Sequence, residues 1–358
     1  ALRVKLLPRE KSAITHRDTR NVEAYDYYLR ARALRATMDL AQIPTSLHAY
    51  RKAIELDPGF ALAWAGLASS LIQNLAHFPQ DEKLSLEEAS FALQRAVALA
   101  PESLDVAAAR AQRAVFDHDW FTVGRCVERF RAADDDNWSI FSHLLLMLGK
   151  PHEAAAQQER VRRADPLSIG GAWALQFHLA CAGRFDEAEA ECRRSAVLPG
   201  GFRAMHWEAL RRKIALGEID AAKAEFSREF NQEAEFLLFA PRLVDALQDK
   251  VEATAVLRKA LADPLSQDQL SFISIADCAV LIGDDDLAFD AMRAAFVEAR
   301  GLMAVELWHP IYARLRKDGR FKQILIDIGL IEYWTRTGDW GQFARPLSAG
   351  DFELVPSY

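Results

Sequence analysis

One residue pattern, between Ser46 and Leu71, limits what this chain can fold into more than any other. Ser46, Tyr50 and Ala53 recur at steps of four and three, which places them on one face of a helix. Asp57-Pro58 then ends that helix, because proline has no amide hydrogen and restricts the residue before it. A second helix follows, and its apolar face contains Trp64, Leu67, Ala68 and Leu71.

This unit of helix, proline and helix recurs at a period of about 34 residues, the length of a tetratricopeptide repeat. Further copies, which keep at least the first two steps, begin at Ala89, Ala154, Ala188, Ala253 and Ala288. The alternation typical of strands is nearly absent. The sequence therefore predicts an all-α tetratricopeptide solenoid of about eight repeats, coiled as a right-handed superhelix.

Turns between the two helices of a repeat support this prediction. Four of them contain a glycine suited to the left-handed C-cap of a helix: Gly149, Gly183, Gly217 and Gly283. The third repeat has the turn DHDW (117–120) instead of a glycine turn. The seventh has Pro241 inside its first helix, so we expect a kink or an early break there.

The repeats divide the 358 residues into four predicted parts. Residues 1–20 are charged and begin with alanine, so we expect a linker from an upstream domain. Residues 21–300 are the repeat array. Residues 301–334 are predicted capping helices, since a solenoid must cover its last apolar face. Residues 335–358 are rich in Gly, Pro and aromatic residues and are predicted to form an extended tail.

Net charge, cysteine spacing and the lack of long apolar runs limit the functional classes to which the chain can belong. The net charge of −7 disfavours general nucleic-acid binding, so basic runs such as RVRR (160–163) and RRK (211–213) are interpreted as solvated helix faces. The four cysteines form no CxxC pair, which favours buried thiols in a reducing compartment over zinc. We find neither a signal peptide nor an apolar run long enough to span a membrane, and we expect a cytoplasmic protein.

The sequence offers no catalytic constellation, and we expect no enzymatic activity and no cofactor. The motifs GxSxG, GxxxxGKS, HExxH and GxGxxG are all missing. His118 lies between Asp117 and Asp119, but adjacent residues in a turn point in different directions, so a capping role is favoured over a metal site. The acidic run GDDD (283–286) lacks the calcium-loop spacing and fits a helix N-terminus better.

Helix spacing predicts a binding surface instead. In this superhelix the first helix of each repeat lines the concave face, and residues beside its packing stripe should point into the groove. The predicted partner-binding residues are Phe116, His143, Trp173, Phe177, Trp207, Arg211 and Arg242. Exposed aromatic rings beside arginines suit a peptide or a carboxylate. The alternative, that these rings are packed between neighbouring helices, stays open.

Three segments resemble one bacterial arrangement: TRNVEAYDYYLRAR (19–32), DHDWFTVGRCVERF (117–130) and WHPIYARLRKDGRFKQILIDIGL (308–330). They are similar to the tetratricopeptide region that follows a TolB-like domain in class III adenylate/guanylate cyclases and in CadC-type winged-helix transcriptional regulators. In that arrangement the last segment usually reads Asp-Pro-Arg-Phe, where this chain has Asp318-Gly319-Arg320-Phe321. No cyclase metal aspartates and no winged helix map onto this chain, so the resemblance implies neither activity for it.

The resemblance implies a non-catalytic interaction and regulatory region of a bacterial signalling protein. Its partner would be a protein or peptide segment in the groove, which could come from the parent's own N-terminal domain. We expect no membrane and no direct nucleic-acid contact, and a homodimer stays open. Two alternatives for the parent also stay open, an adenylate cyclase and a winged-helix transcription regulator.

Overall fold

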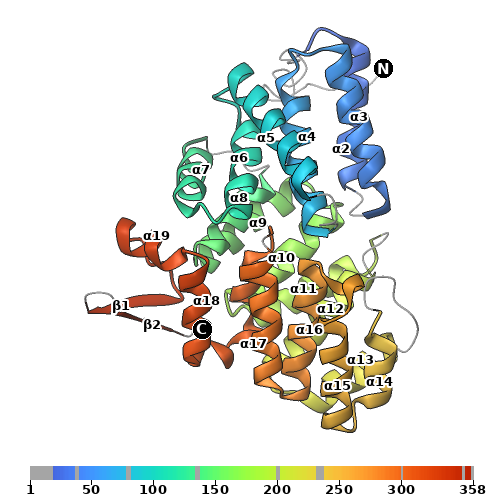
Figure 1. The fold of residues 1–358 in the computed structure, drawn as a ribbon, viewed down its shortest axis with the longest axis vertical. Helices are drawn as coiled ribbons and strands as arrows, with labels where there is room; N and C mark the ends of the chain where they lie inside the picture. The colour runs from blue at the N-terminus through green and yellow to red at the C-terminus, as the bar shows by residue number, and fades with distance from the viewer. Residues whose placement is uncertain are drawn as a thin grey trace. The chain divides into compact units, whose positions relative to one another are not determined.

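The computed structural model describes residues 19–36, 40–77, 82–133, 138–198, 202–230, 238–299, 301–348 and 351–355. The predicted linker at 1–20 lies almost wholly outside them. The chain forms two compact units, and Figure 1 labels their helices and strands. Unit 1 comprises Ala1–Asn74 and Asp81–Arg110, and unit 2 comprises Leu75–Gln80 and Ala111–Tyr358.

Unit 1 begins with a capped helix. Asn21 Oδ1 accepts a hydrogen bond from the amide of Ala24 at 3.1 Å, and Thr19 Oγ1 accepts one from the amide of Asn21 at 3.0 Å. The helices are α2 (Val22–Ala36), α3 (Ile43–Leu56), α4 (Ala61–His77) and α5 (Glu82–Leu99), with a short 3-10 turn η1 (Leu40–Gln42) before α3. The helix predicted to stop at Asp57-Pro58 ends at Leu56, and the next begins at Ala61.

Helix α6 (Leu104–Phe116) crosses from unit 1 into unit 2. The repeat helices of unit 2 are α7 (Trp120–Ala133), α8 (Ser139–Met147), α9 (Pro151–Ala164), α10 (Ile169–Cys181), α11 (Phe185–Ser195), α12 (Phe202–Ala215), α13 (Ile219–Glu229), α14 (Ala240–Ala246), α15 (Lys250–Leu261), α16 (Gln269–Ile282) and α17 (Asp285–Arg293). A 3-10 turn η3 (Pro264–Ser266) lies before α16, and a π-helical turn η4 (Ala294–Glu298) extends α17.

Across the described residues, the helices α2 to α17 follow one another in chain order as eight successive helix–turn–helix units, so the predicted all-α tetratricopeptide solenoid is confirmed. The predicted glycine turns have the expected backbone, with positive φ at Gly149 (84°), Gly183 (74°), Gly217 (79°) and Gly283 (71°). In the DHDW turn, His118 takes φ 57° in place of a glycine. Pro241 lies in the first turn of α14, where proline needs no amide hydrogen, so this helix starts late instead of kinking.

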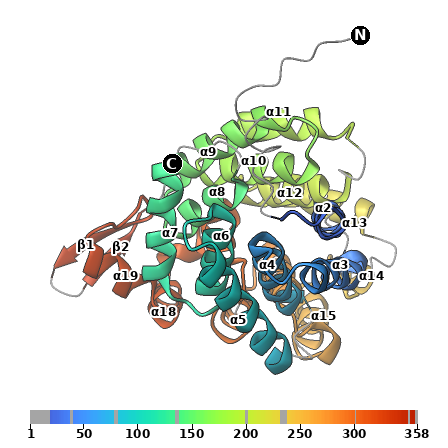
Figure 2. The same cartoon turned by 90° about the horizontal axis from the view of Figure 1, so that it is seen from above.

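The C-terminal part of unit 2 consists of short elements. Three 3-10 turns, η5 (Ala304–Trp308), η6 (Pro310–Tyr312) and η7 (Leu315–Lys317), lead into helices α18 (Gly319–Asp327) and α19 (Leu330–Thr337). Strands β1 (Ala344–Ser348) and β2 (Asp351–Leu354) then pair antiparallel (Figure 2). The predicted extended tail is therefore a hairpin with buried aromatic residues, because Phe343 stacks on Trp308 with ring centroids 4.5 Å apart.

Unit 2 closes on itself. Helix α18 contacts α17, as expected for a cap, but α19 also contacts α7 at the start of the unit. Three hydrogen bonds join the C-terminal part to the turn after α8. Trp308 Nε1 donates to the Met147 carbonyl (3.2 Å), Trp334 Nε1 to the Leu148 carbonyl (3.1 Å), and the Gln342 amide to the Gly149 carbonyl (2.7 Å). The cap therefore binds both ends of the array in unit 2.

Candidate interaction site

Four of the predicted groove residues form one continuous row across the first helices of three repeats. His143 on α8 stacks near Trp173 on α10, with centroids 6.5 Å apart, and Trp173 lies 5.5 Å from Phe177 one turn later. The guanidinium carbon of Arg211, on α12, lies 5.6 Å from the centre of the Phe177 ring. Helix spacing thus identified side chains that lie together.

Most of this row is covered by the chain itself. We call residues 304–312, which contain η5 and η6, the inner segment. Element η5 contacts α8, and η6 contacts α12 and α16. His309 lies 5.4 Å from Phe177, ring to ring, and the Glu306 carboxylate accepts a hydrogen bond from Arg211 Nη2. The face predicted as a groove is therefore filled along this row.

The prediction that Phe116, Phe177 and Arg211 are exposed was wrong. All three are buried, and Arg211 is 1% exposed. The alternative of rings packed between helices also applies to Trp207, which is half-buried and lies 5.5 Å from Phe230, between ring centroids. His143 and Trp173 are half-buried, and Arg242 on α14 is exposed. These three and Trp207 are the predicted residues that retain exposed surface, and the Trp207 ring is engaged by Phe230.

The free energy gained by burying its apolar side chains shows that the inner segment belongs to the hydrophobic core of unit 2 and is not a displaceable ligand. Its apolar side chains are buried: Val305, Leu307, Trp308, Ile311 and Tyr312. Burial of one such side chain contributes about 1.5–3 kcal/mol. Removal of all five from their contacts would cost about 7.5–15 kcal/mol, which is comparable to the whole stability of a typical domain, about 5–15 kcal/mol.

A buried polar cluster holds the inner segment to the helices. The Arg211 guanidinium contacts three carboxylates. Its Nη1 lies 2.8 Å from Glu208 Oε1, its Nε lies 3.0 Å from Asp277 Oδ2, and its Nη2 donates to Glu306. Tyr312 donates its hydroxyl hydrogen to Asp277 Oδ1 at 2.6 Å. One guanidinium therefore serves three carboxylates, all of them shielded from water.

The excess of buried carboxylates over the single Arg211 guanidinium shifts the pKa values of the groups in the cluster. Burial raises the pKa of Glu306 to about 7 and that of Asp277 to about 6, against the opposing effect of Arg211. At Glu208 burial also favours the neutral form, but Arg211 and His309, whose Nε2 lies 3.3 Å from Glu208 Oε2, outweigh it and lower the pKa to about 2. Burial, with Arg211 nearby, lowers the pKa of His309 to about 4. The folded cluster therefore keeps a proton near neutral pH, held by Glu306.

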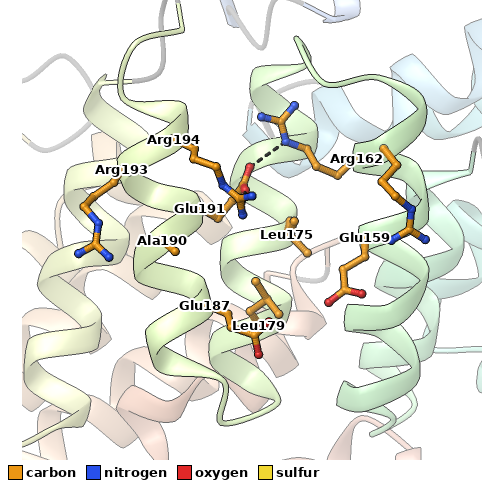
Figure 3. Close-up of a pocket in the computed structure, with 10 residues that line it drawn as sticks. Glu159, Arg162, Leu175, Leu179, Glu187, Ala190, Glu191, Arg193 and Arg194 are labelled. Atoms are coloured by element: carbon orange, nitrogen blue, oxygen red, sulfur yellow. Dashed lines mark hydrogen bonds and ion pairs between the residues drawn. The ribbon is translucent and has the colours of Figure 1, made fainter.

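An open groove lies on another surface of unit 2. It has a volume of about 710 Å³ and lies between α9 and α11, with α10 as its floor (Figure 3). Leu175 and Leu179 belong to the floor. The walls carry charged side chains: Glu159, Arg162, Arg163, Glu187, Glu191, Arg193 and Arg194. Sequence reasoning treated the RVRR run as a solvated face, because nothing in a single helix shows that a second arginine pair, Arg193-Arg194, faces it.

A buried carboxylate organises one end of this groove. Glu191 is 2% exposed, and it accepts a hydrogen bond from Arg162 Nε at 2.8 Å and pairs with Arg194 Nη2 at 2.6 Å. Ser195 Oγ also donates to Glu191, at 3.1 Å. The Arg162–Glu191 bond joins α9 to α11 across the groove (Figure 3). The two guanidinium groups therefore stay in place at the groove wall.

No helix in the described residues is long and apolar enough to cross a membrane. No group of three or more His, Cys, Asp or Glu side chains in these residues is arranged to hold a metal ion, and Asp119 instead accepts the amide hydrogen of Thr122 at 3.0 Å. His118, between the two aspartates of the DHDW turn, stacks near Trp120 with centroids 6.1 Å apart.

No family model and no curated protein matches this chain. Among solved structures, it is similar to yeast Tom70, with 14% identity, 87% of this chain and 69% of that chain covered, and a TM-score of 0.43. It is also similar to PilW, a type IV pilus biogenesis factor, with 14% identity, coverages of 84% and 98%, and a TM-score of 0.29. The tetratricopeptide domain of P58(IPK) gives 12% identity, coverages of 87% and 98%, and a TM-score of 0.26.

Proposed function

We propose that this chain is a non-catalytic protein- and peptide-interaction region with a regulatory role in a bacterial signalling protein. The observation that carries the proposal is the inner segment. The stacked helices of unit 2 already bind an irregular stretch of chain through an arginine–carboxylate pair, an indole–carbonyl hydrogen bond and ring contacts. These are the contacts through which a helical array recognises a peptide.

The assignment to signalling rests on the three resembling segments. Two of them are in direct contact, because Trp120 of the DHDW turn hydrogen-bonds to the carbonyl of Ile328 in the segment 308–330. Sequence features that lie 208 positions apart thus belong to one structural feature. This supports the resemblance as one of a whole unit rather than of separate short matches.

A partner would contact surface that the chain leaves open. From the predicted set we retain His143, Trp173 and Arg242 as proposed contacts, since the first two are half-buried and the third is exposed. The groove between α9 and α11 adds a second accessible surface. Trp207 is not retained, because its indole Nε1 donates to Asp277 at 3.2 Å and its ring packs on Phe230.

Photo-crosslinking tests the proposal. A photoreactive amino acid would replace Trp173, Ala190 in the groove wall or, as a matched control, the exposed Val251 on α15. We expect a specific protein adduct at Trp173 or Ala190 in bacterial cells and none at Val251. The purified chain should not turn over ATP or GTP. Robust turnover after stringent purification, or the absence of adducts at all positions, would contradict the proposed function.

A further inference from the structure

The groove between α9 and α11 carries excess positive charge in a chain whose net charge is −7. Its lining includes four arginines and three glutamates. Two of those glutamates, Glu159 and Glu187, pair with Arg184, at 2.7 and 2.6 Å. The lining therefore has an excess of one positive charge, and the adjacent Arg184 raises the local excess to two. Glu189 and Arg212, which approach each other at 3.9 Å nearby, leave this excess unchanged.

The arginines differ in how firmly they are held. Arg162 is largely buried and is held by the buried Glu191, and the exposed side chain of Arg194 pairs with the same carboxylate. Among the described residues Arg193 pairs with Glu189 alone, at 2.8 Å, and both side chains are largely in water, where an ion pair contributes little. Arg163 is exposed, and the described residues give its side chain neither an ion pair nor a hydrogen bond. Arg163 and Arg193 are thus the groups able to accept a new anion.

The rest of the groove is apolar, because Leu175, Leu179 and Ala190 belong to its lining. A ligand that matches it needs an apolar side chain flanked by negative charge. We propose that the groove binds an acidic peptide segment of a partner protein, with a leucine-like side chain on the floor and carboxylates at Arg163 and Arg193. The proposal rests on the proposed function and names the partner chemistry of one surface.

Nucleic acid is the less suitable anion for this groove. No aromatic ring belongs to the described lining, so a base would have nothing to stack on. The net charge of −7 also repels a polyphosphate at longer range. An acidic peptide needs no aromatic ring to stack on and carries less charge than a polyphosphate. It requires only the arginines of the groove and the apolar floor.

Fluorescence anisotropy with the whole chain tests this inference. The probe is a short dye-labelled peptide that alternates glutamate and leucine, compared with one in which lysine replaces glutamate and one in which serine replaces leucine. The variant is Arg163→Glu with Arg193→Glu. Its control is Arg258→Glu with Lys259→Glu, which reverses two exposed charges on α15. Circular dichroism confirms that both variants fold.

We expect only the glutamate–leucine peptide to bind, the control variant to bind like the wild type, and the groove variant to bind at least tenfold more weakly. Equal binding of the lysine peptide, or equal binding by the groove variant, overturns the inference. So does tighter binding of a dye-labelled single-stranded oligonucleotide through the same two arginines. Absence of peptide binding, combined with a protein adduct at Trp173, overturns the groove inference and leaves the proposed function standing.

Discussion

The indole Nε1 of Trp120 lies 2.6 Å from the carbonyl oxygen of Ile328 and donates a hydrogen bond to it. Trp120 begins the first helix that lies wholly in unit 2, and Ile328 ends α18 in the C-terminal cap. The ring is fully buried, so neither group has water as an alternative partner. This bond is one of the links that close unit 2 on itself.

Replacement of Trp120 with phenylalanine should destabilise unit 2 by about 1–3 kcal/mol, because the buried carbonyl of Ile328 loses its donor. Chemical denaturation followed by far-UV circular dichroism measures the change. Trp173→Phe is the matched control, since Trp173 is half-buried and its indole makes no hydrogen bond within the described residues. Equal stability of the two variants would show that the Trp120 bond does not hold the closure.

Arg211→Ala should be severely destabilising, about 3–5 kcal/mol, because it leaves Glu208, Asp277 and Glu306 buried without their common cation. Arg242→Ala should leave the melting temperature unchanged, since that side chain is exposed. Thermal unfolding of the two variants separates a structural arginine from a surface arginine. If Arg211→Ala melted like the wild type, the buried cluster would not hold the inner segment.

The stability of the protein should depend on pH through Glu306. Its pKa is about 7 in the folded state, above the ordinary value of 4.5, so the folded protein keeps a proton that the unfolded chain has lost. The contribution of Glu306 to stability is therefore complete below about pH 4.5 and is lost as the pH rises through about 7. We expect the stability of the wild type, relative to Glu306→Gln, to fall over that interval.

Comparison of the wild type with Glu306→Gln measures the titration of Glu306 together with its charge interactions with Asp277 and Glu208. Urea unfolding at a series of pH values gives the difference directly. Glu332→Gln is the control, since Glu332 is exposed and pairs with Arg336 at 3.0 Å on the surface of α19. A wild-type and Glu306→Gln difference that stayed constant from pH 5 to 8 would contradict a protonated Glu306.

Truncation at Gly301 should abolish cooperative unfolding of unit 2. The deletion removes the inner segment and the cap, including the buried Trp308, Tyr312 and Phe321, and each loss costs about 1.5–3 kcal/mol. A chain that ends at Val355 is the control, because it keeps all elements described here. Thermal scans of both truncated chains show the difference. Identical melting temperatures would refute the structural role of the C-terminal part.

The repeat architecture was predictable because it is local. The helix stop at Asp57-Pro58 and the left-handed glycines depend only on neighbouring residues, and each is found where the sequence placed it. Even the odd turn at His118 forms the same bonds as the glycine turns. Its amide donates to the Val115 carbonyl and that of Asp119 to the Ala114 carbonyl, as Gly283 and Asp284 donate to Val280 and Ala279.

The candidate site was only partly predictable, because the inner segment that covers it is distant in sequence from the helices that it contacts. Helix spacing located the row from His143 to Arg211, but its partner Glu306 lies 95 positions after Arg211. A signal was present in the stretch ELWHPIY (306–312), which is rich in aromatic and apolar residues yet lacks a helical period. A stretch of this composition has to be buried, but the repeat pattern does not identify the helices that cover it.

Closure of unit 2 also determines how it responds to force. An open helical array behaves as a spring, because each repeat rotates slightly on the next and the small rotations add up along the axis. In unit 2 the carbonyls of Met147 and Leu148 are tied to Trp308 and Trp334, so extension would break buried hydrogen bonds. We therefore expect unit 2 to keep its curvature under tension and to lengthen less than an open array does.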